Sequence, residues 1–400
     1  MHLFSSNHQI HRGEEKNKIL YYYPTDNDLN TKVRTVGLCE AVIKFTGTFG
    51  TSPCEALHTQ KTKQVFLEPE PGFWMVMTLN VPFQQKSRDG QVYMEYFTDE
   101  IQDHIYQSLL LKSYRMFTLM HGTFGSIVGE KKEDVATLRK KLNEFYENYL
   151  MNLKSSDADL LDIFQGIHFL PLERYSFLKI LCFINQVEEK FRCIKYSVFL
   201  YNDQLVWSGL EPEDTQVVYQ YLSLEQIPFF IESELKGGVF SPSRTSPFGS
   251  GTHFGKFMTG PRSMEDEAGL QKLPKIFLSN GKTCCYFIAY RALNATVCLL
   301  VEVSNQLKLE FFKCLDVELG NQLSSLASEI GEQYSKTISQ MKDFGEIIGK
   351  TLTDCWVVGK LSDERELYVI LQQKNANIVD VNDELKKLSA SYFQSIFIMD

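Results

Sequence analysis

The chain has 400 residues, 44% hydrophobic and 23% charged, a composition typical of a globular protein with two or three domains. Its 50 Asp and Glu residues outnumber 41 Lys and Arg, which gives a formal net charge of −9 at pH 7. That balance argues against nucleic acid as the main partner, because binding to phosphates requires a basic face.

The nine cysteines have neither the spacing of a disulfide framework nor a C-x-x-C pair, and most lie in apolar runs. They are predicted to be reduced, buried thiols of a cytosolic protein. The beginning of the chain lacks the basic and apolar regions of a signal peptide, and no apolar run approaches the ~18 residues of a membrane span. Any contact with a membrane is therefore expected to be peripheral.

The first part of the chain is predicted to contain strands, a helix, further strands and two helices. An apolar run at 18–23 predicts a strand, with 3–4 in its hairpin partner. A helix capped at Asn30 or Thr31 is expected to end near Gly47. Its apolar side is predicted to comprise Val33, Val36, Leu38, Val42 and Phe45. Strands at 63–67, 73–79 and 92–97 and helices over 99–117 and 135–149 complete this part.

A similar order recurs twice. Strands at 195–201 and 204–208 flank Asn202-Asp203 as a hairpin, and a helix over 213–222 and a Gly-, Ser- and Pro-rich loop at 234–252 follow. Strands at 275–278, 284–290 and 295–303 then lead to a helix over 309–330. The last part has a hairpin at 355–359 and 366–371, a helix from Asp380 and a strand at 392–398. This repetition predicts three related α+β domains, at 1–155, 156–335 and 336–400.

No group of residues indicates bond-making chemistry. Gly345 to Thr351 imitates a phosphate-binding loop, but it has three residues between the glycines where four are needed, and we interpret it as a linker. The histidines never pair at metal-ligand spacing, and the acidic run 157–162 lacks the glycine and terminal glutamate of a calcium loop. The expectation is no catalytic residue, no metal and no cofactor.

Several segments resemble the Ccz family in order along nearly the whole chain. They are 57–61 (LHTQK), 66–70 (FLEPE), 73–77 (FWMVM), 200–211 (LYNDQLVWSGLE), 259–261, 274–277, 356–360 (WVVGK) and 366–377. The resemblance implies three longin domains, each with a mixed, mostly antiparallel sheet flanked by helices. One stretch, at about 334–350, is short for the family, and the third domain at 336–400 is expected to be reduced.

The resemblance further implies a subunit of a heterodimeric guanine nucleotide exchange factor. With its Mon partner, joined through the first longin domains, it would activate the late-endosomal and vacuolar Rab GTPase. That activity would promote endosome maturation and the fusion of autophagosomes, vacuoles and lysosomes. A third regulatory subunit in animals and anionic or phosphoinositide membranes are further implied partners. The implied location is the cytoplasm, with peripheral recruitment to late endosomes, lysosomes and autophagosomes.

Residues of the first longin domain are the interface candidates. Thr59, Gln60, Lys61 and Phe66 are predicted to contact the Rab, and Glu68 and Glu70 to engage a lysine of its switch region. For apolar residues such as Phe66, packing in the core is the stronger interpretation. Basic residues Arg139, Lys140 and Lys141 either meet anionic lipid or, by default, form a solvated helix face.

Two other functions remain open. The first is a subunit of the related exchange factor for lysosome-related organelles, although the segments at 57–61 and 200–211 favour the Mon–Ccz type. The second is a longin-type trafficking adaptor or scaffold without exchange activity. The sequence does not separate an adaptor from an exchange factor, because both require only protein interfaces.

Overall fold

The computed structural model divides into two compact units, 1–327 and 328–400, and each is described by itself. The residues it describes are 1–6, 15–50, 53–88, 91–98, 101–129, 132–152, 167, 169–170, 172–227, 244–245, 252–253, 255–261, 273–279, 281–305, 307–341, 346–350, 356–362 and 365–371.

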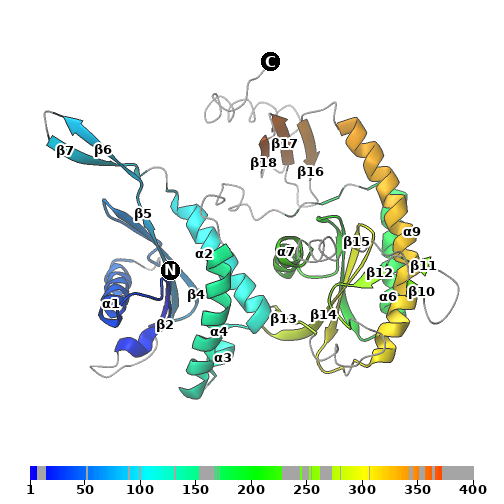
Figure 1. The fold of residues 1–400 in the computed structure, drawn as a ribbon, viewed down its shortest axis with the longest axis horizontal. Coiled ribbons are helices and arrows are strands. Elements are labelled where there is room, and N and C mark those ends of the chain that lie inside the picture. Colours follow the sequence, from blue (N-terminus) through cyan, green and yellow to red (C-terminus); the bar gives the residue numbers. More distant parts are fainter. Residues whose placement is uncertain are drawn as a thin grey trace. The chain divides into compact units, whose positions relative to one another are not determined.

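The first sheet has five antiparallel strands in the order β2-β1-β5-β4-β3 (Figure 1). The strands are β1 (His2–Ser5), β2 (Ile19–Tyr22), β3 (Ala56–His58), β4 (Thr62–Glu70) and β5 (Phe73–Asn80). Because successive side chains of a strand point to opposite faces, each central strand supplies both sides of the sheet. Leu3, Val65 and Met75 face one core, and their neighbours Phe4, Phe66 and Val76 face the other.

Helices cover both faces of this sheet. Helix α1 (Leu29–Thr46) packs on one face through Val36 and Cys39. Helices α2 (Asp103–His121) and α4 (Lys132–Asn152) pack on the other through residues such as Phe117 and Tyr146, with the short α3 (Phe124–Val128) between them. The predicted hairpin, strands and helices of this part are confirmed. Along the chain, β5 is followed by a separate two-stranded ribbon of β6 (Phe83–Arg88) and β7 (Gln91–Tyr96), and α2 comes after it.

The predicted apolar side of α1 is partly wrong. Val36 is buried, but Leu38 and Phe45 lie on the surface, while Cys39 and Glu40 take the buried positions. The helix carries two apolar stripes, and only the one that contains Val36 faces the sheet. The cap is Asp28, whose side chain accepts a hydrogen bond from the Thr31 N–H.

The second sheet is also antiparallel, in the order β12-β14-β15-β8-β9, and β13 pairs with the other end of β14. Its strands are β8 (Ile194–Tyr201), β9 (Gln204–Ser208), β12 (Gly255–Phe257), β13 (Lys275–Leu278), β14 (Thr283–Ala292) and β15 (Ala295–Glu302). The predicted hairpin at Asn202-Asp203 is confirmed, and Asn202 adopts φ 55°, a conformation that asparagine tolerates well. Of the loop predicted at 234–252, the structure describes only Arg244–Thr245 (β10) and Thr252, which begins β11 (Thr252–His253).

Three helices cover the second sheet. Helix α7 (Pro212–Tyr221) shares a core with strand residues such as Val198 and Phe287, and the π-helical turn at Leu222–Gln226 follows it. On the other face, α6 (Arg174–Lys190) brings Phe183 against Phe199, and α9 (Leu309–Met341) brings Phe312 against Phe257. Helix α6 is not predicted from the sequence above, although its buried positions recur at helical spacing.

Helix α2 belongs to two cores. Its residues Leu110 and Phe117 pack under the first sheet, whereas Met116 and Leu119 join the core of the second sheet with Val218 and Ile276. A hydrogen bond of 2.8 Å from Arg115 Nη1 to Gln216 Oε1 adds a polar contact between α2 and α7. The first two α/β layers therefore share one helix.

The second unit contains an antiparallel three-stranded sheet of β16 (Glu346–Lys350), β17 (Trp356–Ser362) and β18 (Arg365–Leu371). The hairpin predicted at 355–371 is confirmed. The linker predicted at 345–351 is wrong, because most of that segment is strand β16, in register with β17. The helix predicted from Asp380 and the strand at 392–398 lie outside the described residues.

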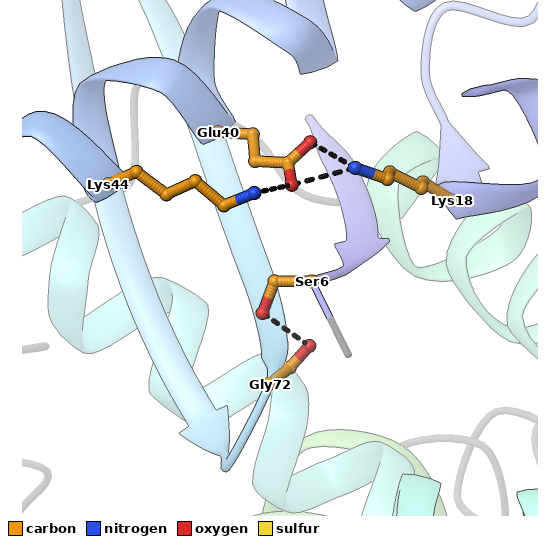
Figure 2. A network of polar contacts seen from close by, with 5 residues as sticks. All are labelled: Ser6, Lys18, Glu40, Lys44 and Gly72. Carbon is orange, nitrogen blue, oxygen red and sulfur yellow. Dashed lines mark hydrogen bonds and ion pairs between the residues drawn. The ribbon is translucent and has the colours of Figure 1, made fainter. Parts of the chain in front are cut away.

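A polar network fixes α1 to the beginning of the chain (Figure 2). Lys18 Nζ donates to both carboxylate oxygens of Glu40 at 2.7 Å, and Lys44 Nζ donates to Glu40 Oε1 at 2.7 Å. Near it, Ser6 is held by Gly72, whose carbonyl accepts from the Ser6 N–H at 2.8 Å and from its hydroxyl at 3.3 Å. Burial raises the pKa of Glu40, and hydrogen bonds from the two ammonium groups lower it by more, so that the net pKa lies below its usual value.

We predict that the stabilisation from the Lys18–Glu40 pair disappears in acid. A folded-state pKa below the unfolded one gives stability that is complete above the unfolded value, near 4.5, and is lost as the pH falls through the folded value. Lys18→Met should lower the free energy of unfolding by about 1 kcal/mol at pH 7 and by much less near pH 3. Urea unfolding of Lys18→Met at both pH values measures this, with Lys16→Met in the same exposed turn as control. A constant difference across pH would contradict it.

Gly255 is required by the buried ring of Tyr290. A Cβ atom at Gly255 would lie 1.9 Å from the Tyr290 hydroxyl, which donates to Asp316 Oδ1 at 2.8 Å. We expect Gly255→Ala to lower the free energy of unfolding by about 1–3 kcal/mol, because the ring and its hydrogen bond must shift. Thermal unfolding checks this. Gly37→Ala in α1 is the control, since nothing lies within 4 Å of its added Cβ and a small gain is expected.

Candidate functional site

The turn between β3 and β4 presents three of the six predicted interface residues. The Thr59 N–H and hydroxyl both donate to the Thr62 carbonyl at 2.9 Å, and the Thr62 N–H donates to Thr59 Oγ1 at 2.9 Å. Gln60 and Lys61 are exposed at the tip. Thr59 therefore shapes the turn, and the side chains of Gln60 and Lys61 are accessible at its tip.

The other three predicted residues have structural partners. Phe66 is buried in the core beneath α1, as the core interpretation expects. Glu68 Oε1 accepts from the Gly72 N–H at 2.7 Å and so closes the turn between β4 and β5. A role of the glutamates in an interface stays a prediction.

Glu70 joins three elements. Its Oε1 atom accepts from the Tyr114 hydroxyl at 2.9 Å and from the Phe124 N–H at 2.6 Å, and its Oε2 atom accepts from the Gly125 N–H at 2.8 Å. The carboxylate thus links the end of β4 to α2 and satisfies the free N–H groups at the start of α3. Across β4, Glu70 lies about 26 Å from the β3–β4 turn, at ~3.3 Å per residue. Thr59, Gln60 and Lys61 therefore lie at one end of β4 and Glu68 and Glu70 toward the other, with Phe66 buried between them.

An exposed apolar face on α1 is a further candidate; the sequence interpretation included this helix among the interface segments but favoured core packing for its apolar residues. Leu38 is 56% exposed, Phe45 64% and Phe49, just beyond the helix, 75%. The rings of Phe45 and Phe49 meet edge to face with centroids 4.9 Å apart. Between these side chains, Gly37 has open space where a Cβ would stand, and Ala41 follows one turn later. We call Gly37, Leu38, Ala41, Phe45 and Phe49 the α1 face.

Helix α7 is the counterpart of α1 in the second sheet, since each follows the first hairpin of its layer. Val217, Val218 and Tyr221 of α7 are buried in a core formed with the second sheet and with Met116 and Leu119 of α2. On α1, the outward side is the exposed α1 face. Isolated apolar side chains on a surface are ordinary, but a contiguous apolar patch with aromatic residues is typical of a protein interface.

The buried pair of His2 and Cys39 resembles a nucleophile with its base, but both groups are held neutral. Cys39 Sγ lies 3.5 Å from His2 Nε2. Burial raises the pKa of the Cys39 thiol to about 12, and burial, with the positive N-terminus, lowers the pKa of His2 to about 3. A thiol in this state is a poor nucleophile. Within the described residues, no group of three or more His, Cys, Asp or Glu could hold a metal.

Of the three basic residues considered for lipid contact, Arg139 is engaged in the fold. Its guanidinium donates to the carbonyls of Asn17 at 2.7 Å and Ile19 at 3.2 Å. Lys140 is exposed and lies 3.9 Å from Glu144, an ordinary solvated pair. In the part of the chain that the structure describes, no helix is both long and apolar enough to cross a bilayer.

Comparison with known proteins identifies longin domains along the chain. A family model described as the first longin domain of INTU, CCZ1 and HPS4 matches residues 2–122. Models of Intu longin-like domains 2 and 3 match residues 194–325 and 300–388. The expected fold of three longin-like domains is thereby confirmed. The bounds at 155 and 335 stay predictions, and the second of them falls inside α9.

Relatives that match nearly the whole chain carry one name. The Xenopus laevis protein named vacuolar fusion protein CCZ1 homolog is 41% identical over 446 residues, with 97% of this chain and 94% of the relative covered. Proteins of the same name from Nematostella vectensis and Dictyostelium discoideum are 41% and 27% identical, covering 100% and 96% of this chain and 97% and 94% of their own. Similarity therefore extends across all three domains.

We predict that Glu70→Ala destabilises the fold. Removal of the carboxylate leaves the Tyr114 hydroxyl and two backbone N–H groups of α3 without their acceptor, which should lower the free energy of unfolding by about 2–3 kcal/mol. Glu68→Ala, which loses one hydrogen bond at a turn, should cost less than about 1 kcal/mol. Equilibrium unfolding in urea compares the two, and equal effects would contradict the structural role of Glu70.

Proposed function

The chain belongs to the family of the vacuolar fusion protein CCZ1 homologs, and from this premise we propose that it is one subunit of a heterodimeric guanine nucleotide exchange factor. Its partner would be a Mon subunit and its substrate the late-endosomal and vacuolar Rab GTPase. Family membership supports the broader role in vacuolar fusion and trafficking. The α1 face is the observation in the structure that best supports an obligate partner for the first longin domain.

The α1 face suits a second helix that packs closely. Glycine inside a helix costs roughly 0.5–1 kcal/mol relative to alanine, and among the residues that the structure describes none packs at Gly37 in a way that requires it. With Ala41 one turn away, Gly37 leaves a shallow strip along which another backbone can approach, flanked by Leu38 and Phe45. The Lys18–Glu40–Lys44 network flanks this strip, because Glu40 and Lys44 lie three and seven residues after Gly37 on the helix, and it fixes α1 to the beginning of the chain.

Exchange requires no bond-making group on this chain. A Rab that holds GDP and Mg²⁺ tightly releases them slowly, and a partner that binds the nucleotide-free form better than the loaded form accelerates release. A ~10⁴-fold acceleration needs about 5.5 kcal/mol of differential binding, which a few buried side chains of an ordinary interface can supply. The exposed β3–β4 turn, with Gln60 and Lys61, is the part of the predicted contact set that remains accessible for this role.

The assembled complex would be recruited peripherally to late endosomes, lysosomes and autophagosomes. A membrane with anionic lipids or phosphoinositides and, in animals, a third regulatory subunit belong to the same proposal. Without exchange activity, the same interfaces would serve a trafficking adaptor.

We predict that only the complete heterodimer accelerates the release of GDP from the Rab. Release of fluorescent GDP from the late-endosomal Rab is measured with this chain alone, the Mon subunit alone, and both together. Acceleration with both and with neither alone is expected, because the Rab surface is shared. A stable, stoichiometric complex that leaves the release rate unchanged would contradict the exchange function and support the adaptor.

Variants of the α1 face test the pairing within the same assay. Leu38→Asp should weaken the heterodimer at least about tenfold without unfolding the chain, because it places a charge in a buried contact. Gly37→Ala should stabilise the isolated chain yet weaken pairing. Leu178→Asp is the matched control, because Leu178 is an exposed leucine on α6, and it should leave pairing unchanged. Equal effects of Leu38→Asp and Leu178→Asp would contradict the assignment of α1.

A further inference from the structure

The β6–β7 ribbon is a two-faced structure. Its register pairs Phe83 with Tyr96, Gln85 with Met94 and Ser87 with Val92, so these six side chains share one face. The alternate positions, which include Lys86, Tyr93 and Glu95, form the other face, where Lys86 and Glu95 make an ion pair. One face is thus mostly apolar and the other polar.

The apolar face lies open to solvent. Val92 is 61% exposed, Phe83 57% and Met94 50%. On this face the Phe83 and Tyr96 rings lie 5.7 Å apart, and the Tyr96 hydroxyl approaches the Met94 sulfur at 3.7 Å. Among the described residues no third strand pairs with the ribbon. A two-stranded ribbon is marginally stable by itself, and one with an open apolar face is expected to gain from a partner.

The base of the ribbon adjoins the β3–β4 turn. The Val81 N–H donates to the Lys61 carbonyl at 2.9 Å, and the Phe97 N–H closes the base through the Pro82 carbonyl at 2.8 Å. At the same end, His58 Nε2 lies 2.6 Å from Asp103 Oδ2, and Lys63 Nζ donates to the Ile101 carbonyl at 2.7 Å. A partner bound at Gln60 and Lys61 would therefore lie next to the ribbon, which extends for about 20 Å at ~3.3 Å per residue.

The charge of the ribbon favours a protein over a lipid surface. Lys86 and Arg88 are balanced by Asp89 and Glu95, so that the net charge of residues 83–96 is zero, and the whole chain carries −9. Attraction to anionic lipid depends on clustered basic residues, which the ribbon lacks. Aromatic and methionine side chains with few charges are instead the composition of the centre of a protein interface.

We propose that the β6–β7 ribbon is a second contact with the GTPase, next to the β3–β4 turn, and that it packs Phe83, Val92 and Met94 against an apolar patch of that protein. This inference rests on the proposed exchange function and adds to it a contact that none of the six predicted interface residues supplies. The polar face, with Lys86 and Glu95, stays in solvent.

Two neighbouring substitutions test the proposal in the heterodimer. Met94→Glu places a charge on the apolar face, and Tyr93→Glu places the same charge on the polar face, one residue away and 45% exposed. Met94→Glu should weaken binding of the nucleotide-free GTPase at least about tenfold, and Tyr93→Glu less than about twofold. Pairing with the Mon subunit and the melting temperature should be unchanged in both. Hydrogen exchange of residues 83–96 should slow when the GTPase binds to the unmodified complex.

Other results would overturn the proposal in distinguishable ways. Equal GTPase binding by the two variants, while the unmodified heterodimer accelerates GDP release, would refute the ribbon contact and leave the proposed function intact. Loss of co-sedimentation with phosphatidylcholine–phosphatidylserine vesicles by Met94→Glu, with GTPase binding unchanged, would assign the ribbon to the membrane. Failure of the unmodified heterodimer to accelerate release would refute the exchange function and the ribbon's role in it together.

Discussion

One carboxylate, that of Glu70, holds together elements that the chain reaches at widely separated points. It accepts from α2 through Tyr114 and from the first N–H groups of α3, so that it fixes the turn between these helices to the end of β4. The same turn lies against the segment between β13 and β14 of the second sheet, since a Cβ atom added at Gly281 would lie only 3.2 Å from Thr123. The Glu70 carboxylate of the first sheet therefore holds in place a turn that contacts the second sheet.

Elements whose apolar residues recur at a regular spacing, and strands that flank a tight turn, could be predicted from the sequence. The hairpin at Asn202, the strands β4 and β5 and the helix α2 each carry a local signal that matches their final environment. Strand β16 could not be predicted in this way, because its short sequence with Gly349 resembles a loop and becomes a strand only by pairing with β17. Local pattern and tertiary pairing disagree there, and pairing prevails.

The candidate site was harder to predict than the fold. Burial of Phe66 agrees with its apolar type, but the engagement of Glu70 by α2 and α3 depends on residues more than forty positions away. On α1, composition shows that Leu38 and Phe45 are apolar but does not show which of two stripes faces the sheet. The structure resolves this point, because Val36 and Cys39 pack with strand residues whereas Leu38 and Phe45 are exposed.

The double role of α2 bears on how the protein can be divided and synthesised. A fragment that ends near residue 155 would keep α2 but lose the second sheet, and Met116 and Leu119 would then face water. Such a fragment would carry an apolar stripe prone to aggregation, although it includes every strand of its own sheet. On the ribosome, the same stripe stays uncovered until α7 has emerged and is not fully covered until β13 follows. The natural unit of folding is therefore longer than the repeat that the sequence displays.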